Sequence, residues 1–283
     1  MVGIKTILGR EILDSRGIPT VEVDVFLEDD SSYGRASVPS GSSTGSFEAH
    51  ELRDNDDKRY FGKGVLNAIN YINTEINETL KGFDATNQKL IDLTLNELDN
   101  TKNKSRLGAN SILGVSLATA KASSMHYNIP LYRYLGGISN ILPTPMMNIV
   151  NGGCHANNCL DFQEFMIIPA NFECFSDALR AGSEIFSILK KILNENNFSV
   201  SVGDEGGFAP DFKSTNHCLD TIIQAIDKSN YSIGEDIFLG LDVASSEFFK
   251  EDKYILKGEN LILNSDQIIK YYENLIKNYP IVS

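Results

Sequence analysis

Polar segments in the second half of the chain carry residue types that could bind a metal ion and move protons. They interrupt or follow short apolar runs, and they are Asn151–Asn158 with His155, Gln163 with Glu164, Gly203–Gly207 with Asp204 and Glu205, and Asp242 near the end of Ile237–Val243. In a βα barrel the loops at the carboxyl ends of the strands meet at one mouth, so such segments can come together. Carboxylates placed there suit Mg²⁺, and the imidazole of His155 can donate a hydrogen bond to a ligand.

Each polar segment also has a structural interpretation when it is taken alone. A single loop histidine such as His155 is more often structural or solvated, and Glu164 is typical of a surface acid at the start of a strand. Asp242 could cap a helix. However, an acid that ends an apolar strand is costly to bury without a cation, which favours a Mg²⁺ ligand at this position.

The glycine-rich turn around Asp204 and Glu205 is more specific, since glycines on both sides of two acids allow a ligand to approach closely. Adjacent residues point in different directions, so we expect only one of the two acids to enter a site. A second glycine- and hydroxyl-rich loop, Pro39–Ser46, contains Ser43 and could close over a ligand. Its composition alone would favour a solvated linker.

Composition limits the classes of function that the chain can have. Its 283 residues carry a formal net charge of -13, which repels polyanions and excludes a nucleic-acid partner. No run reaches the roughly 20 apolar residues of a membrane span, and the start of the chain lacks a signal peptide, so we expect no membrane partner and a cytoplasmic location. The four cysteines show no CxxC pair and are expected to be reduced packing residues.

The first half of the chain predicts an α+β domain. Alternating apolar residues in the region from Ile4 to Pro39 indicate a three-stranded antiparallel meander. The region from Asp56 to about Met125 has helical spacing, and the helix after Gly108 is rich in small residues, which allow close packing at the centre of the domain.

After Pro130 the pattern changes to short apolar runs followed by turns and helix-length segments, as in a βα barrel or a parallel sheet. The expected strands are Met146–Val150, Phe165–Ile168, Val200–Val202 and Ile237–Val243, and the expected helices are Phe175–Leu193, His217–Lys228 and Asp266–Asn278. We therefore predict two domains, 1–135 and 136–283, the second an α/β TIM-like barrel. Because Tyr279–Ser283 resembles the opening of another buried strand, we expect this barrel to be truncated.

The order of these motifs along the whole chain resembles the enolase family, of bacterial type, over its N-terminal two-thirds. The matching stretches are Asp14–Gly17, Pro39–Gly45, Gly108–Asn110, Asn151–Gly153 with His155, Gln163–Met166, Gly203–Gly207, and Asp242 with Ala244–Phe248. The resemblance implies a capping domain followed by a modified barrel. It also implies a cytoplasmic hydro-lyase of glycolysis, phosphopyruvate hydratase, that dehydrates 2-phosphoglycerate reversibly to phosphoenolpyruvate.

Roles for single residues follow from the resemblance. Asp242 would hold the tighter of two Mg²⁺ ions, and Ser43 would close onto the second. Glu205 would be the catalytic acid with Glu164 assisting at the leaving group, while Gln163, His155 and Glu164 would contact the substrate. A homodimer is implied, and in bacteria also a cell-surface or secreted form.

The resemblance places the lysine base, two further metal ligands and most of the phosphate-binding groups beyond Ser283. We therefore expect the 283-residue chain by itself to be inactive. The alternatives are a catalytically inert enolase fragment that acts as a binding or structural protein, and a sugar-acid dehydratase of the same superfamily. The hydroxyl-rich loop at Pro39–Gly45 and the Gly203–Gly207 turn disfavour the latter.

Overall fold

The computed structural model describes residues 1–41 and 44–283, and the chain forms two compact units, Met1–Asn140 and Ile141–Ser283. Each unit buries its own hydrophobic core. Within the described residues, no helix combines the length and the apolar character needed to cross a bilayer.

The first unit contains the predicted three-stranded antiparallel meander, formed by β1 (Ile4–Leu13), β2 (Pro19–Leu27) and β3 (Tyr33–Ser37) in that order. On β2, alternate valines point into the core and are fully buried. Alternation of this kind is what the pleat of a half-covered strand requires, and the expectation of a meander is confirmed.

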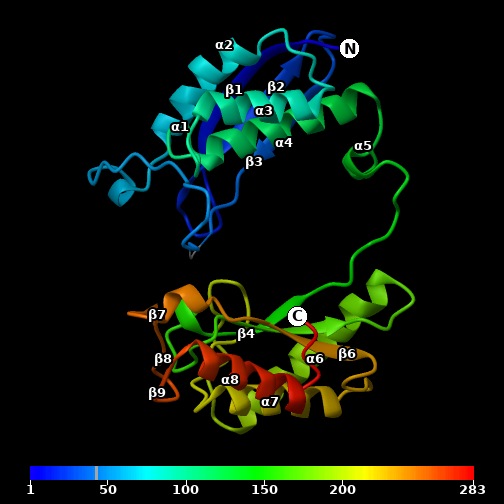
Figure 1. Ribbon diagram of the computed structural model, residues 1–283. Helices are drawn as coiled ribbons and strands as arrows, with labels where there is room; N and C mark the ends of the chain where they lie inside the picture. Colours follow the sequence, from blue (N-terminus) through cyan, green and yellow to red (C-terminus); the bar gives the residue numbers. More distant parts are fainter. Residues whose placement is uncertain (42–43) are drawn as a thin grey trace. The chain divides into compact units, whose positions relative to one another are not determined.

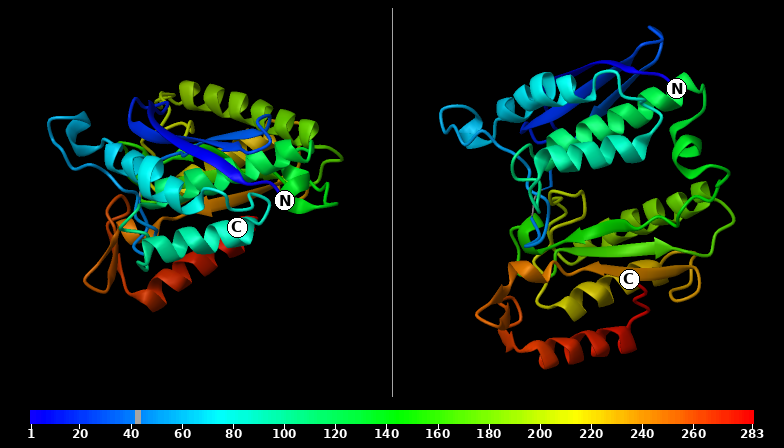
Figure 2. Two further views of the ribbon diagram at one scale, coloured as in Figure 1. Left: turned by 90° about the horizontal axis from the view of Figure 1, so that it is seen from above. Right: turned by 45° about the horizontal axis from the view of Figure 1, so that its top comes forward.

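Helices cover one face of this sheet (Figure 1). They are α1 (Leu66–Tyr71), a π-helical segment (Ile72–Ile76), α2 (Asn77–Leu80), α3 (Gln88–Asp99) and α4 (Ala109–His126), preceded by a 3-10 turn at Tyr60–Gly62. Helix α5 (Leu131–Gly136) packs on α4. Figure 2 shows α3 and α4 side by side. The helical spacing expected for the region from Asp56 to Met125 is confirmed, although a π-helical segment separates α1 from α2.

Helix α4 packs directly on the backbone of β3, as its small residues predicted. A Cβ atom built on Gly34 of β3 would overlap the carbonyl oxygen of Ala118 and the backbone nitrogen of Ala122. Ala118 and Ala122 are themselves fully buried. The contact therefore depends on the absence of a side chain at Gly34 and on small side chains across from it.

We predict that Gly34→Ala lowers the free energy of unfolding by about 2–3 kcal/mol, because the new methyl group meets rigid backbone instead of a movable side chain. Urea unfolding measures the change. Gly136→Ala is the matched control, since its Cβ would have no neighbour nearer than 3.9 Å. Equal losses in the two variants would contradict the close approach of α4.

An ion network covers a polar part of the same sheet. The Asp24 carboxylate is 2% exposed and accepts hydrogen bonds from Arg10 and from Arg35, whose Nε lies 2.6 Å from Oδ1. The Arg35 hydrogen bond is the main cause, and the Arg10 hydrogen bond adds to it; together they lower the pKa of Asp24 to about 2, against the opposing effect of burial.

The lowered pKa of Asp24 predicts a loss of stability in acid. The folded pKa lies below the unfolded value of about 3.9. The ionised Asp24 carboxylate therefore contributes its full share to the free energy of unfolding above about pH 3.9, and this share disappears as the pH falls toward 2. Asp24→Asn should therefore cost about 1–3 kcal/mol at pH 7. Unfolding measured from pH 7 to pH 2 should show wild type and variant converging; a difference that stays constant over this range would refute the assignment.

The second unit is built on a mixed set of strands and helices. They are β4 (Met147–Asn151), a 3-10 turn (Gly153–His155), β5 (Glu164–Pro169), α6 (Phe175–Glu195), α7 (Thr215–Asp227), β6 (Ile237–Asp242), a 3-10 turn (Ser245–Glu247), the small sheet β7 (Phe249–Lys250), β8 (Lys253–Leu256) and β9 (Leu261–Leu263), and α8 (Ser265–Asn278). The three long helices fall where the sequence predicted them. The small sheet was not predicted.

Strand β5 runs antiparallel to both of its neighbours, β4 and β6. The expectation that every run would be followed by a helix and pair in parallel is wrong here, because a loop without an α-helix joins β4 directly to β5. A connection without a crossover helix is typical of antiparallel strands. As a result, the start of β5 lies beside the ends of β4 and β6.

The expected strand at Val200–Val202 is also wrong. Val202 is 59% exposed and forms only a single bridge, to Phe208. Phe208 itself lies beside β4, where its nitrogen donates to the Ile149 oxygen and its oxygen accepts from the Asn151 nitrogen. The apolar residue that extends the sheet therefore comes after the glycine-rich turn, not before it.

The residues after α8 form an isolated bridge to β6, where a strand was expected. The Leu239 nitrogen donates to the Pro280 oxygen and the Leu241 nitrogen donates to the Ser283 oxygen, and Ile281 pairs with Leu239 in parallel. Among the described residues these strands form an open sheet, and the barrel is not closed.

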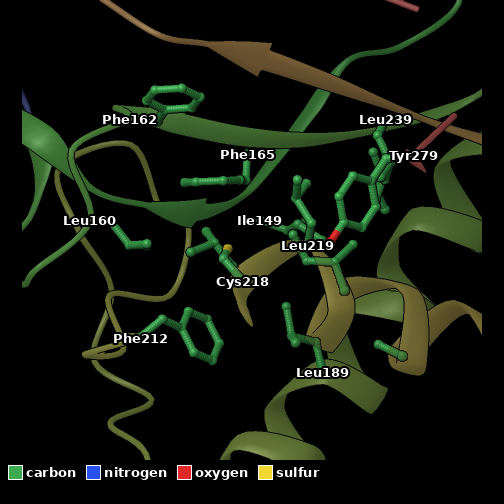
Figure 3. Close-up of a cluster of buried hydrophobic side chains, with 14 of the residues drawn as sticks. Ile149, Leu160, Phe162, Phe165, Leu189, Phe212, Cys218, Leu219, Leu239 and Tyr279 are labelled. Carbon is green, nitrogen blue, oxygen red and sulfur yellow. The ribbon is translucent and has the colours of Figure 1, made fainter. Parts of the chain in front are cut away.

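Large apolar side chains fill the space between this sheet and helices α6 and α7 (Figure 3). Phe165 and Leu239 come from the strands, while Leu189 and Leu219 come from the helices, and all four are at most 1% exposed. Cys218 lies in the same core. The expectation that all four cysteines are packing residues is wrong for Cys154, Cys159 and Cys174, which are exposed; all four are free thiols.

Candidate active site

The register of the second sheet places three polar residues in a row across its edge. Asn151 at the end of β4 pairs with Glu164 at the start of β5, and Glu164 pairs with Asp242 at the end of β6. Side chains of directly paired residues lie on one face, with Cβ atoms about 4.5–5.5 Å apart. The reversed direction of β5 therefore brings Glu164 between Asn151 and Asp242.

The loop after β4 carries His155 to this edge. The Gly152 nitrogen donates to the Gln163 oxygen at 2.9 Å, and the Gly153 nitrogen donates to the Leu160 oxygen at 2.8 Å, which closes the base of the loop. Gly153 has a φ of +50°, a conformation that glycine adopts without strain. His155 is consequently held with only 4% of its surface exposed.

The glycine-rich turn reaches the same place from another part of the chain. The Asp204 nitrogen donates to the His155 oxygen at 3.1 Å, and a Cβ on Gly203 would lie 2.5 Å from that oxygen. Glu205, next along the turn, has its Oε1 3.8 Å from His155 Nδ1, while Glu164 Oε1 lies 3.7 Å from the same nitrogen. Of the two adjacent acids, Glu205 is the one that joins the cluster.

The cluster of His155, Glu164 and Glu205 could hold a divalent cation. One ligand atom from each of the three residues lies within 4.8 Å of the others, and among the described residues this is the only such group of histidine, cysteine and acidic side chains. Carboxylate oxygens are the ligands that Mg²⁺ prefers. Asp242 is not a member of this group but pairs with Glu164 in the sheet.

The electrostatics of the cluster also fit a cation. Burial, the negative charge of Glu205, a hydrogen bond with Glu205 and the charge of Asp242 raise the pKa of Glu164 to about 7, in that order of importance. No lysine or arginine among the described residues is a cause of this shift, and the basic side chain paired with Glu164 is His155. A positive ion would relieve the repulsion among Glu164, Glu205 and Asp242.

The remaining predicted residues have different surroundings. Gln163 is 4% exposed, and its backbone nitrogen donates a hydrogen bond to the backbone oxygen of Asp242 at 3.1 Å. The Asp242 carboxylate is exposed and accepts from the Ala244 nitrogen at 3.1 Å. It does not cap a helix, because the turn that follows begins after Ala244. Ser43 lies outside the described residues.

Sequence reasoning did not single out Asn151. Its side chain is fully buried at the edge that carries the cluster, although it was considered only as the first residue of a glycine-containing loop. The signal that could have identified it is a carboxamide at the end of an apolar strand, where burial of a polar group is costly.

We predict that Glu164→Gln stabilises the metal-free chain at pH 8. A carboxyl group whose folded pKa of about 7 exceeds the unfolded value of about 4.3 contributes stability that is complete below the unfolded value and is lost as the pH rises through 7. The neutral amide removes that loss, which we expect to be about 1–2 kcal/mol after allowance for solvent screening.

Unfolding in the presence of a chelator at pH 5 and pH 8 measures this difference. The gain in the free energy of unfolding of Glu164→Gln should be confined to pH 8. The control Glu273→Gln, on the exposed face of α8, should show no difference between the two pH values. A variant less stable than wild type at pH 8 would show that the Glu164 charge is not destabilising.

Comparison with known families identifies both units. The sequence model of the enolase N-terminal domain matches residues 4–135, and that of the enolase C-terminal TIM barrel domain matches residues 139–283.

Proposed function

The chain belongs to the enolase family, and we propose from this membership that it serves the reversible Mg²⁺-dependent dehydration of 2-phosphoglycerate to phosphoenolpyruvate. The observation that best supports the proposal is the meeting of His155, Glu164 and Glu205 from three separate segments, beside Asp242. A lone acid or histidine would be poor evidence for a catalytic site. A cluster of ionisable side chains that raise the pKa of one member is better evidence.

Charge explains why this reaction would suit the cluster. Removal of a proton next to a carboxylate adds negative charge to a group that already carries it, and bound Mg²⁺ would supply the compensating positive charge. Asp242 would hold the tighter ion, as the resemblance implies, because its exposed carboxylate is free of ion pairs in the described part of the chain. Ser43 would serve the second ion.

The two glutamates would handle the leaving hydroxyl group. Loss of hydroxide requires a proton, and Glu205 would donate it, as the resemblance implies; at 45% its side chain is more exposed than that of Glu164, at 14%, and can reach a ligand. Glu164 is hydrogen-bonded to Glu205 and would help to hold the proton on the pair. His155 and Gln163 would contact the substrate from the edge of the site.

A second candidate is a catalytically inert member of the family that acts as a binding or structural protein. One observation favours it: in the described part of the chain no lysine forms an ion pair with Glu164 or Glu205, so His155 is the only basic side chain paired with them. A sugar-acid dehydratase is the least favoured candidate. We also propose, from the resemblance alone, a cytoplasmic homodimer.

Formation of phosphoenolpyruvate from 2-phosphoglycerate, followed by ultraviolet absorbance, distinguishes these candidates. We expect no turnover from the 283-residue polypeptide with Mg²⁺, because in the described part of the chain no lysine forms an ion pair with Glu164 or Glu205. Measurable Mg²⁺-dependent turnover would reject the inert alternative. Turnover of a sugar acid without any activity on 2-phosphoglycerate would reject the proposed reaction.

In any form of the protein that shows turnover, we predict that Glu205→Gln lowers dehydration by about 10²–10⁴-fold, the usual contribution of a general acid. Exchange of the substrate α-proton with solvent should persist, since acid and base act on different atoms. Nuclear magnetic resonance follows this exchange, and Glu273→Gln is the control. Simultaneous loss of exchange and dehydration would argue against Glu205 as the acid.

A further inference from the structure

The carboxamide of Asn151 is fully buried, and neither its Oδ1 nor its Nδ2 has a hydrogen-bond partner within the described part of the chain. The backbone of the same residue is well paired. Its nitrogen donates to the Phe208 oxygen at 2.8 Å, and its oxygen accepts from Asn158 Nδ2 at 3.0 Å. The lack of partners is therefore a property of the side chain and not of a loosely held segment.

The Asn151 side chain supports the turn that carries Glu205. A Cβ on Gly203 would lie 2.8 Å from Asn151 Cβ and 3.0 Å from its Cγ, and a Cβ on Gly207 would lie 2.7 Å from its Oδ1. Only glycine allows the backbone of the turn to come this close. Both ends of the turn thus rest on the carboxamide, while Glu164 lies opposite in the sheet.

The turn is otherwise held by few bonds. The Gly203 nitrogen donates to the Gly207 oxygen, the Gly206 nitrogen donates to the Gly203 oxygen, and the Asp204 nitrogen donates to the His155 oxygen. Two of these three bonds lie inside the turn, and Gly206 has a φ of +83°. A small movement of the turn as a body would change its contact with Asn151 without breaking the two internal bonds.

An apolar side chain of the same size would fill this space without burying two unpaired dipoles, and such a replacement is usually neutral or stabilising. A buried polar group without partners therefore requires an explanation, and one explanation is a state in which the group becomes paired. The nearest polar groups that can move toward it are the peptide groups of the Gly203–Gly207 turn.

We propose that Asn151 is a positioning residue for Glu205. When a cation and an anionic substrate occupy the cluster, the turn settles on Asn151, the carboxamide hydrogen-bonds a peptide group of the turn, and Glu205 is fixed against Glu164. This proposal takes the identity of the ligand from the proposed function. Asn151 does not itself touch the reacting atoms.

Asn151→Leu separates this role from simple packing, because the two effects have opposite signs. The free chain should unfold a few degrees higher, since two unpaired polar atoms are removed. With Mg²⁺ and 2-phosphoglycerate, affinity measured by calorimetry should fall at least tenfold, and the thermal shift caused by the ligand should be lost. Asn151→Asp, which keeps the shape and one type of hydrogen bond, should recover part of the affinity.

Asn148→Leu is the matched control. Asn148 lies on the same strand, and its Oδ1 and Nδ2 are also buried without partners among the described residues. This variant should gain thermal stability and keep wild-type affinity. Unchanged affinity in Asn151→Leu, or a free chain less stable than wild type, would overturn the positioning role alone. Absence of any ligand effect in wild type would overturn the proposed function and the positioning role with it.

Discussion

The direction of strand β5 is the constraint on which the candidate site depends. If β5 ran parallel to β4 and β6, Glu164 would lie at the opposite edge of the sheet from Asn151 and Asp242. Because it runs antiparallel, the first residue of β5 pairs with the last residues of both neighbours. In barrels the functional residues usually lie at the carboxyl ends of the strands, as Asn151 and Asp242 do. Glu164 instead lies at the amino end of its strand.

The same constraint creates the electrostatic problem that defines the site. Paired like charges in a sheet are destabilising, and here Glu205 adds a third carboxylate from a separate turn. The protein compensates Asp24 in its first unit with two arginines, whereas in the described part of the chain Glu164 is paired with no arginine or lysine, only with His155. The two acids therefore differ in kind. The first is a stabilised structural ion, whereas the second is a group left open to an external positive charge.

Much of the fold could be predicted from local patterns in the sequence. Alternating valines on β2 predicted the meander, and small residues predicted the tight packing of α4 on Gly34. The direction of β5 could not be predicted in this way, because an apolar run has the same pattern in either direction. Val200–Val202 was misjudged because hydrophobicity alone does not show that the chain reverses at Gly203–Gly207 before a residue joins the sheet.

For the site, sequence motifs identified residues that the structure brings together, namely His155, Glu164 and Glu205. Their roles in catalysis, and those of Gln163, Asp242 and Ser43, stay predictions. The position of Asn151 at the end of an apolar strand was a weak signal, since an asparagine before two glycines also suits an ordinary turn. Only its burial and its contacts with Gly203 and Gly207 show that it differs from a turn residue.

The short connection between β4 and β5 also has a consequence for the order in which the sheet assembles. Asn151 and Glu164 are separated by only a loop, so their pairing costs little chain entropy and can form early. The pairing of Glu164 with Asp242 must instead wait until helices α6 and α7 and the segment between them have been placed. The two mutually repelling carboxylates thus meet only after a large part of the apolar core is available to hold them together.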